Sequence, residues 1–275
     1  MKTIIPSEVS AVELQTIMQT AIAPRPIALA STINEKGEVN LSPFSFFNMF
    51  STVPPVIIFS PSRRVRDNTT KHTLENVHKI KEVVIGVVNF PIVQQVSLAS
   101  TEYEEGVNEF VKAGLTMKDA DLVQAKLIEE CPVNFECKVM EIKSLGEQGG
   151  SGNLVICEVV KIHVREEYLN EEGKLDQHKL DLVARLGGNW YSRNNSQSLF
   201  EVPKPLATKG IGFDNLPENI KVSRIFTGND LGMLANIEAL PGKTFTYEES
   251  VHIEAQKLLR NNKIQEAWEL LVVEK

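Results

Sequence analysis

One stretch of the sequence decides the fold: residues 24–62, which read PRPIALASTINEKGEVNLSPFSFFNMFSTVPPVIIFSPS. Its two apolar, β-branched runs, Ile27–Ile33 and Val56–Phe59, are bounded by Pro, Gly and Asn, so we predict a strand for each. Asn34–Gly37 is a short polar loop that ends in glycine, the residue a hairpin needs where the backbone takes a positive φ. The stretch therefore predicts the beginning of an antiparallel β-sheet.

Between these two predicted strands lies a segment of mixed composition, Asn40–Asn48 (NLSPFSFFN). It is too aromatic for a solvent-exposed loop and too rich in small polar groups for an ordinary core segment. Such a mixture suits a flat, half-polar ligand, because apolar side chains can cover its rings while hydroxyls, amides and backbone N–H groups meet its edges. We therefore expect this segment to line a ligand site.

The overall composition argues against several classes of partner. The chain of 275 residues carries a formal net charge of −7, which disfavours nucleic acid or an anionic membrane. No stretch is apolar and long enough to span a bilayer, and the N-terminus lacks the layout of a secretory signal. The three cysteines, Cys131, Cys137 and Cys157, are odd in number and lack zinc-site spacing, so we expect structural thiols in a protein of the reducing cytoplasm.

Three further segments have the pattern of strands. Glu82–Asn89 is a β-prone apolar run, whereas Pro132–Ser144 and Asn153–Arg165 alternate apolar and polar side chains. The short separations between predicted strands favour antiparallel pairing over βαβ crossovers. We therefore predict a mainly β protein, a closed or nearly closed barrel with helical insertions, preceded by a short helix over Val9–Thr20.

The character of the sequence changes at Phe200. Prolines at positions 203, 205, 217 and 241 punctuate an irregular segment. The chain then ends in Tyr247–Val272, where apolar residues recur at helical spacing. We predict two domains: a barrel over residues 1–199, and a C-terminal extension over residues 200–275 that is first irregular and then helical.

Residues 61–73 (PSRRVRDNTTKHT) form a basic, hydroxyl-rich loop in an acidic protein. The loop leads into Leu74–Ile80, a predicted short helix for which Thr73 is the expected N-cap. Free N–H groups and the helix macrodipole favour an anion at such a position, so one interpretation is a phosphate site. The other interpretation, a solvated surface loop, fits the same spacing.

The sequence holds no zinc spacing, nucleophile elbow, P-loop or Rossmann glycine fingerprint, so no metal site is expected. Its histidines are scattered, and we keep only His163, in an alternating strand, as a candidate catalytic residue. The paired glycines of Leu182–Ser192 either let the backbone approach a ligand or form a tight turn. A flat-ligand segment and a basic loop are what a protein needs when its cofactor carries the chemistry, and flavin mononucleotide (FMN) requires both.

In its motifs and their order the chain resembles the flavin reductase-like proteins, whose fold is a Greek-key, antiparallel split β-barrel that binds FMN. The resemblance runs from about Pro24 to Tyr191. It is carried by residues 24–32 (PRPIALAST), 40–48 (NLSPFSFFN), 54–60 (PPVIIFS), 71–76 (KHTLEN), 108–114 (NEFVKAG), 131–137 (CPVNFEC), 157–164 (CEVVKIHV) and 184–191 (ARLGGNWY). The resemblance implies a homodimer with FMN at its interface and NADH or NADPH as the electron donor, with hydride transfer to flavin N5.

Carried over position by position, the resemblance also implies a set of cofactor-binding residues. One position departs from the family, because His72 stands where the phosphate-binding Lys-Asp-Thr motif usually has Asp. The implied contacts are Ser31 and Thr32 with the ring or ribityl chain, Asn40, Ser42, Pro43, Phe46 and Asn48 with the ring, Ser60, Ser62 and Arg63 with the ribityl–phosphate side, Lys71 and Thr73 with the phosphate, and Arg185 and Tyr191 with the partner subunit's site.

A second departure bears on activity. Many family members with established reductase activity carry a histidine before the strand that starts here at Leu154, where this chain has Asn153. Two functions therefore stay open: an NAD(P)H-dependent flavin oxidoreductase that supplies a monooxygenase or another acceptor protein, and a flavoredoxin-like carrier that holds FMN tightly without efficient NAD(P)H turnover. A third interpretation, a barrel that has lost its cofactor, is disfavoured because the phosphate loop and the ring segment both persist.

Overall fold

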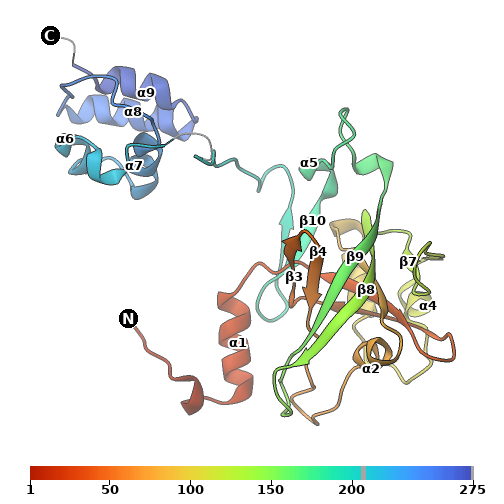
Figure 1. Ribbon diagram of the computed structural model, residues 1–275. Helices are drawn as coiled ribbons and strands as arrows, with labels where there is room; N and C mark the ends of the chain where they lie inside the picture. Colours follow the sequence, from red (N-terminus) through yellow and green to blue (C-terminus); the bar gives the residue numbers. More distant parts are fainter. Residues whose placement is uncertain (206–208, 274–275) are drawn as a thin grey trace. The chain divides into compact units, whose positions relative to one another are not determined.

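The computed structural model describes residues 1–205 and 209–273, and the chain divides into two compact units, Met1–Leu199 and Phe200–Lys275 (Figure 1). The first unit is built on a seven-stranded sheet in which neighbouring strands pair antiparallel. The second unit is helical. These features confirm the expected mainly β fold with helical insertions and a helical C-terminal part.

The order of the strands makes the sheet curl. Along the sheet it is β2-β1-β5-β8-β9-β4-β3. The strands are β1 (Ala28–Ile33), β2 (Val39–Phe44), β3 (Phe47–Thr52), β4 (Pro55–Phe59), β5 (Glu82–Val87), β8 (Val133–Ser144) and β9 (Asn153–Val164). The two edge strands, β2 and β3, are consecutive in the chain, and Ser45 and Phe46 are the residues between them. Because so short a connection cannot span an open sheet, the edges must approach each other, as in a barrel.

The segment Asn40–Asn48 differs from the sequence prediction. It forms the end of β2 and the start of β3 rather than a connection between strands. Asn, Ser and Pro have low strand propensity, which hid these strands. Pairing with β1 overrides that propensity, since Ser42 lies opposite Ala30 and Asn40 lies opposite Thr32.

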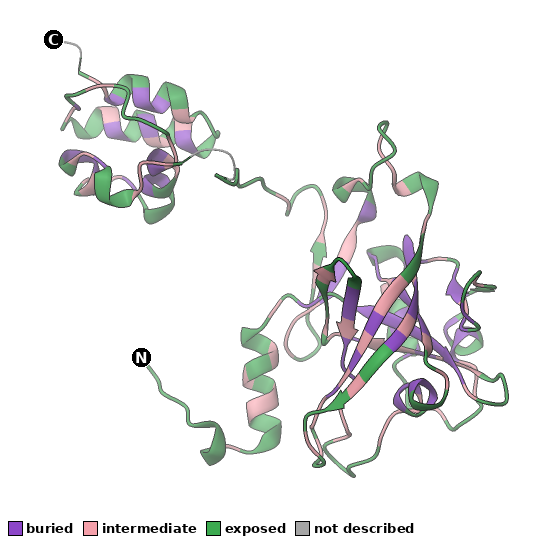
Figure 2. Ribbon diagram, viewed as in Figure 1, coloured by how far each residue is buried: buried purple, intermediate pink, exposed green. Residues whose placement is uncertain are grey.

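Strands β1 and β5 are buried on both faces, whereas the long strands β8 and β9 are partly exposed, as their pink and green segments in Figure 2 show. Ala28 and Ala30 of β1 belong to an inner cluster that draws on β2, β4, β5, β8, β9 and helix α2 (His72–Lys79). Leu29, between them, belongs to an outer cluster with residues of α3 (Val93–Leu98), α4 (Glu109–Ala113) and β7 (Leu127–Ile128). This alternation gives β1 and β2 one face inside the barrel and one face outside it.

The remaining elements of the first unit lie around the barrel. Every residue of helix α1 (Ala11–Ala21) is at least partly exposed. A hairpin of β10 (Leu182–Arg185) and β11 (Tyr191–Asn194) replaces the compact turn expected over residues 182–192. The other elements are η1 (Pro6–Glu8), η2 (Phe90–Ile92), β6 (Met117–Lys118), η3 (Glu166–Tyr168) and α5 (Gln177–Leu180).

The second unit has its own core. Its elements are η4 (Phe213–Asn215), α6 (Glu218–Lys221), α7 (Gly228–Ala235), α8 (Glu249–Arg260) and α9 (Ile264–Leu271). Trp268 is fully buried among them, and its indole N–H donates to the carbonyl oxygen of Leu234 at 3.2 Å. Thr227 and Asp230 form a capping box at the start of α7. Across residues 1–205 and 209–273, no helix has the length and apolar character needed to cross a membrane.

The close packing of β5 gives a test of the outer cluster. A Cβ at Gly86 would lie 2.6 Å from Sγ of Cys131 and 3.0 Å from Cδ1 of Ile128. We predict that Gly86→Ala lowers the free energy of unfolding by about 1–3 kcal/mol, because an added methyl group overpacks the core. Urea unfolding followed by circular dichroism measures the change. Adding Cys131→Ala to this variant should recover part of the loss, and a Gly86→Ala protein as stable as the wild type would show that the packing is looser than described.

Candidate functional site

A largely apolar groove of about 510 Å³ lies between helix α1 and the barrel. Leu14, Met18 and Ile22 form one wall, and Phe46 and Val65 face them from the barrel side. Its polar lining comes from Gln15, Gln19, Arg25 and Ser151. A volume of this size with a few polar groups is typical of a small-molecule site.

Arg25 ties helix α1 to the barrel. The side chain is buried, and its guanidinium donates to the carbonyl oxygens of Gln19 (2.5 Å), Ile22 (2.7 Å) and Leu186 (3.0 Å). The first two carbonyls are at the C-terminus of α1, where a cation is favourable. Burial, together with the nearby Arg185, lowers the pKa of Arg25. The sequence alone does not reveal this role of Arg25, because its partners are backbone carbonyls that belong to no motif.

Two loops distant in sequence meet at the groove. The backbone N–H of Arg63 donates to the carbonyl oxygen of Ser151 at 2.9 Å, and that of Gly150 donates to the carbonyl oxygen of Arg63 at 3.0 Å. A Cβ at Gly149 would lie 2.9 Å from the carbonyl oxygen of Arg64, so only glycine allows this approach. The basic loop is therefore held against the β8–β9 turn.

The basic loop delivers two cations that lack an acidic partner. Within the described part of the chain, neither Lys71 nor Arg63 has a carboxylate within 4.0 Å of its charged nitrogens, whereas Arg64 pairs with Glu102 at 2.8 Å. Arg63 instead donates to Asn68. The ammonium of Lys71 lies 5.3 Å from the centre of the Phe44 ring, and its pKa is lowered by burial and by Arg64.

Thr73 lies inside the first turn of α2, and Lys71 occupies the N-cap position. The expectation that Thr73 caps this helix is therefore wrong. Its hydroxyl instead donates to the side-chain oxygen of Asn40 at 2.8 Å, and the amide of Asn40 donates to Glu109 at 2.8 Å. The pKa of Glu109 is raised, chiefly by burial. The hydrogen bonds of Thr73 and Asn40 thus connect the start of α2 to β2 and to Glu109 of α4.

Ser31 and Thr32 are both fully buried and point in opposite directions. The hydroxyl of Ser31 accepts from the backbone N–H of Lys126 at 3.2 Å on the outer face of β1. The hydroxyl of Thr32 accepts from the amide of Asn76 in α2 at 3.0 Å on the inner face. Ser60 is buried as well. Of the other predicted residues, Ser42 and Ser62 are half-buried and Asn48 is exposed.

Pro43, Arg185 and Tyr191 gather in a different place. They line a polar pocket of about 320 Å³ between β2, α3 and the β10–β11 hairpin. The guanidinium of Arg185 lies 4.6 Å from the centre of the Tyr191 ring. The structure therefore divides the predicted residues among the α1 groove, the loop before α2 and this second pocket.

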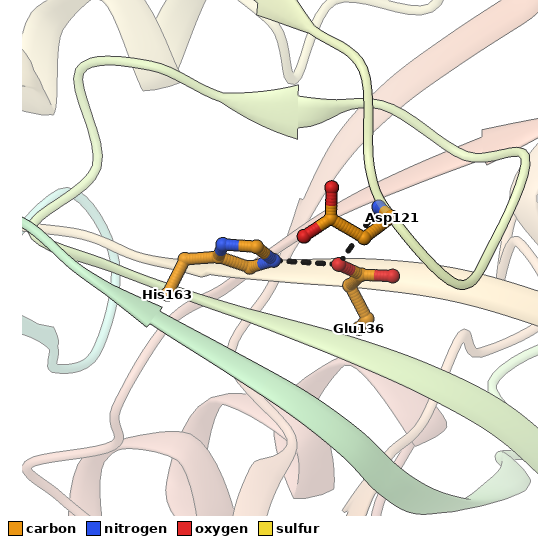
Figure 3. A group of neighbouring side chains, drawn as sticks. All are labelled: Asp121, Glu136 and His163. Atoms are coloured by element: carbon orange, nitrogen blue, oxygen red, sulfur yellow. Dashed lines mark hydrogen bonds and ion pairs between the residues drawn. The ribbon is translucent and has the colours of Figure 1, made fainter.

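His163 takes part in a polar cluster with the buried Glu136 and the exposed Asp121 (Figure 3). Its Nε2 lies 2.5 Å from Oε1 of Glu136, a fully buried carboxylate. Glu136 also accepts from the backbone N–H groups of Asp121 (3.0 Å) and Leu122 (2.6 Å). Burial raises the pKa of Glu136, whereas the hydrogen bonds from His163 and from the backbone lower it. The hydrogen bonds together have the larger effect, so the net shift of the pKa is downward. Through Glu136, His163 therefore helps to hold the loop before β7 in place.

Comparisons with known proteins show which family and which solved structures this chain is similar to. A family model described as flavin reductase like domain matches residues 20–180, more than half of the chain. An uncharacterized protein of Aquifex aeolicus (strain VF5) is 36% identical over 170 residues, which cover 62% of this chain and 84% of that protein.

Two solved structures are similar in fold. Nitrilotriacetate monooxygenase component B from Bacillus cereus is 26% identical, with a TM-score of 0.68, over 74% of this chain and 98% of that chain. A protein from Shewanella frigidimarina NCIMB 400, described as having a split barrel domain, is 23% identical, with a TM-score of 0.61, over 72% of this chain and 95% of that chain. The split β-barrel expected from the sequence is confirmed.

Arg25 can be tested through helix α1. We predict that Arg25→Ala lowers the free energy of unfolding by about 1–3 kcal/mol, because three partly buried carbonyls lose their charged donor. Hydrogen exchange over residues 11–21 should rise more than exchange in the central strands. Arg66→Ala, at an exposed arginine of the basic loop, is the control and should leave α1 unchanged. Equal exchange in α1 of the wild type and the Arg25→Ala variant would contradict the assigned role.

The lowered pKa of Glu136 predicts a pH dependence. A carboxyl group whose pKa is depressed in the folded state contributes stability above its unfolded pKa, and that contribution disappears as pH falls through the folded value. We predict that Glu136→Gln is less stable than the wild type at pH 7, and that the difference narrows below about pH 4. Melting temperatures across this range measure it. Glu141→Gln, at an exposed position of the same strand, should show no such narrowing.

Proposed function

This chain belongs to the flavin reductase like family, and on that basis we propose that it binds FMN and acts as an oxidoreductase with NADH or NADPH as electron donor. The flavin site would lie in the domain over residues 1–199, with residues 200–275 as an extension outside it. The observation that carries the proposal is the pair of cations without acidic partners in the basic loop.

A phosphate group fits the surroundings of these cations. The chain has a net charge of −7, so carboxylates that could neutralise surface cations are abundant. Lys71 is nevertheless half-buried beside Arg64 without an anion of its own among the described residues. A partly desolvated ammonium of this kind gains most from a bound oxyanion. Lys71 and Arg63 would hold the FMN phosphate, and the buried hydroxyl of Thr73 would support the turn that presents Lys71.

The α1 groove and the residues beside it suit a flat ring. Phe46 and Val65 offer apolar surface, while Ser151 and Arg25 offer polar contacts at the edge. Ser42 and Asn48 flank Phe46 along β2 and β3, and Ser62 lies next to Arg63, whereas Pro43 lines the second pocket. Ser31, Thr32 and Ser60 are buried, and the side chain of Asn40 is bonded to Thr73 and Glu109, so these residues would shape the site rather than contact the ring through their side chains.

Bound FMN would supply the redox chemistry, by accepting a hydride at its ring from the nicotinamide donor. The protein groups would bind and orient it. Apolar side chains of α1 would exclude water from one side of the ring, and Arg25 would hold α1 in place to do so. No proton donor of the chain is required by this account, consistent with His163 being engaged with Glu136.

A specific observation favours the second candidate, a flavoredoxin-like electron carrier. Asn153 is buried, and its amide donates to the carbonyl oxygen of Pro61 at 3.0 Å. At the position where many reductases of the family carry histidine, this chain thus has an asparagine that anchors the basic loop at Pro61. The similarity to a monooxygenase component B supports the reductase, with a monooxygenase or another protein as electron acceptor. Rapid reduction of the flavin by NADH or NADPH separates the two candidates.

We also propose that two copies of the chain assemble with the flavin at their interface. Support comes from an exposed apolar strip along and beyond the edge strand β3, where Met49 is 66% exposed, Phe50 64% and Val53 90%. An edge strand with such side chains is prone to pairing with another chain. Phe46, three residues before Met49 in the chain, lines the α1 groove.

The phosphate assignment gives a direct test. We predict that Lys71→Ala weakens FMN binding by roughly 10–100-fold, because a charge-assisted hydrogen bond contributes about 1.5–3 kcal/mol. Fluorescence titration of the apoprotein with FMN measures the dissociation constant. Riboflavin, which lacks the phosphate, should bind the variant and the wild type alike.

Lys79→Ala is the matched control for Lys71→Ala. Lys79 is an exposed lysine at the other end of α2, 3.7 Å from Glu35. Its loss should leave FMN binding unchanged. If Lys71→Ala binds FMN as tightly as the wild type, the phosphate lies elsewhere; if the wild type binds no FMN, the proposed function is wrong.

A further inference from the structure

The polar pocket between β2, α3 and the β10–β11 hairpin has the composition of an anion site. Its polar lining consists of Ser45, Ser97, Ser100, Arg185, Asn189 and Tyr191. None of the described residues that line it is acidic. In a chain of net charge −7, a pocket with an arginine, several hydroxyls and an amide but no carboxylate is a place where an anion gains rather than loses electrostatic energy.

Arg185 has donor groups to spare in this pocket. Its Nη2 donates to the carbonyl oxygen of Gly188 at 2.8 Å, and its guanidinium lies over the Tyr191 ring. Within residues 1–205 and 209–273, its Nε and Nη1 groups have no hydrogen-bond acceptor, and no carboxylate lies within 4.0 Å. A half-buried guanidinium, held in orientation on two sides and open on a third, is well arranged to bind an oxyanion.

A second guanidinium adds to the positive potential. The backbones of Arg25 and Arg185 exchange hydrogen bonds of 3.0 and 2.9 Å, so the two residues are direct neighbours. The Arg25 side chain bonds only neutral acceptors, and its weak contact with Ser45 (3.5 Å) reaches toward the pocket lining. The charges of both arginines are therefore uncompensated at this place.

The pocket is distinct from the loop that carries Lys71. Successive residues of β2 point to opposite faces of the barrel wall. Phe44, over which Lys71 lies, belongs to the inner cluster and borders the pocket together with Pro43 and Ile27, but Lys71 itself is not among the residues that line the pocket. The loop before α2 therefore presents Lys71, whereas the β10–β11 hairpin presents Arg185 to the pocket.

We infer that the Arg185 pocket binds an oxyanion group of the second substrate, separate from the flavin phosphate. The group is a phosphate of the nucleotide electron donor or a carboxylate of an organic acceptor, since both offer oxygens that match a guanidinium fork. The choice of the second substrate as its source rests on the proposed function, but the existence of the anion site does not.

The test uses the full-length protein saturated with FMN. Isothermal titration calorimetry with adenosine 2′,5′-bisphosphate probes for a nucleotide phosphate, and a parallel titration with benzoate probes for a carboxylate. We expect one of the two to bind the wild type. Arg185→Gln should weaken that binding about 10-fold or more, because it removes a charge-assisted bond. Ser97→Ala keeps the charge and should weaken it about threefold.

Arg193→Gln is the matched control. Arg193 lies in the same hairpin and carries the same charge, but it bonds Asp181 and lies over Phe90. Its loss should change the affinity less than twofold, and circular dichroism establishes that each variant is folded. If Arg185→Gln unfolds the hairpin, the Ser97→Ala titration decides the question.

The outcomes separate this inference from the proposed function. Binding of the bisphosphate that needs Arg185 identifies the donor, and binding of benzoate that needs Arg185 identifies the acceptor. The inference is overturned if neither probe binds, if Arg185→Gln and Ser97→Ala bind the probe like the wild type, or if Arg185→Gln loses FMN, which would make the pocket part of the flavin site. If the wild type takes up no FMN yet the probe binds through Arg185, the proposed function fails and the anion site stands.

Discussion

The connection of two residues, Ser45 and Phe46, between the edge strands of the sheet imposes the geometry on which the sites depend. It forces the sheet to curl, and curling gives β2 an inner and an outer face. The inner face meets α2 and the loop that carries Lys71, whereas the outer face meets α3 and the β10–β11 hairpin. Phe46, at the bend itself, is left beside helix α1. Closure of the barrel thus gives the segment from β2 to Phe46 three different environments: the barrel interior, the outer face and the groove beside α1.

The distribution of charge follows the same geometry. The protein is acidic, and several of its cations are paired with carboxylates, as Arg64 is with Glu102 and Arg193 with Asp181. Lys71 and Arg185 are half-buried and have no carboxylate partner among the described residues, and Lys71 does not line the pocket that holds Arg185. Desolvating a cation without a partner costs free energy, so such positions are informative about ligands. For Lys71 the proposed partner is the flavin phosphate, and for Arg185 it is an oxyanion of the second substrate.

The sequence allows much of the fold to be predicted, because strands such as β5 and β9 carry their pattern locally. The strands β2 and β3 are hidden, since their Asn, Ser and Pro residues have low strand propensity and form strands through pairing with the neighbouring strands β1 and β4. The same limit applies to the site. The motif around Lys71 is visible in the sequence, but the role of Arg25 depends on carbonyl groups as far away as Leu186. Thr73 is a residue for which a local pattern misleads. The pattern predicts that it caps α2, but its hydroxyl donates to Asn40 of β2 instead.

The central claim is that this split barrel holds a flavin that a nicotinamide nucleotide reduces. The most direct test is the absorption spectrum of the freshly purified protein, with FMN added if none is bound, followed by anaerobic addition of NADH and then NADPH. Our account predicts the absorption of bound flavin and its rapid bleaching by one of the two nucleotides. Bleaching by dithionite but by neither nucleotide would support the carrier instead. A colourless protein that takes up no added FMN would contradict the account.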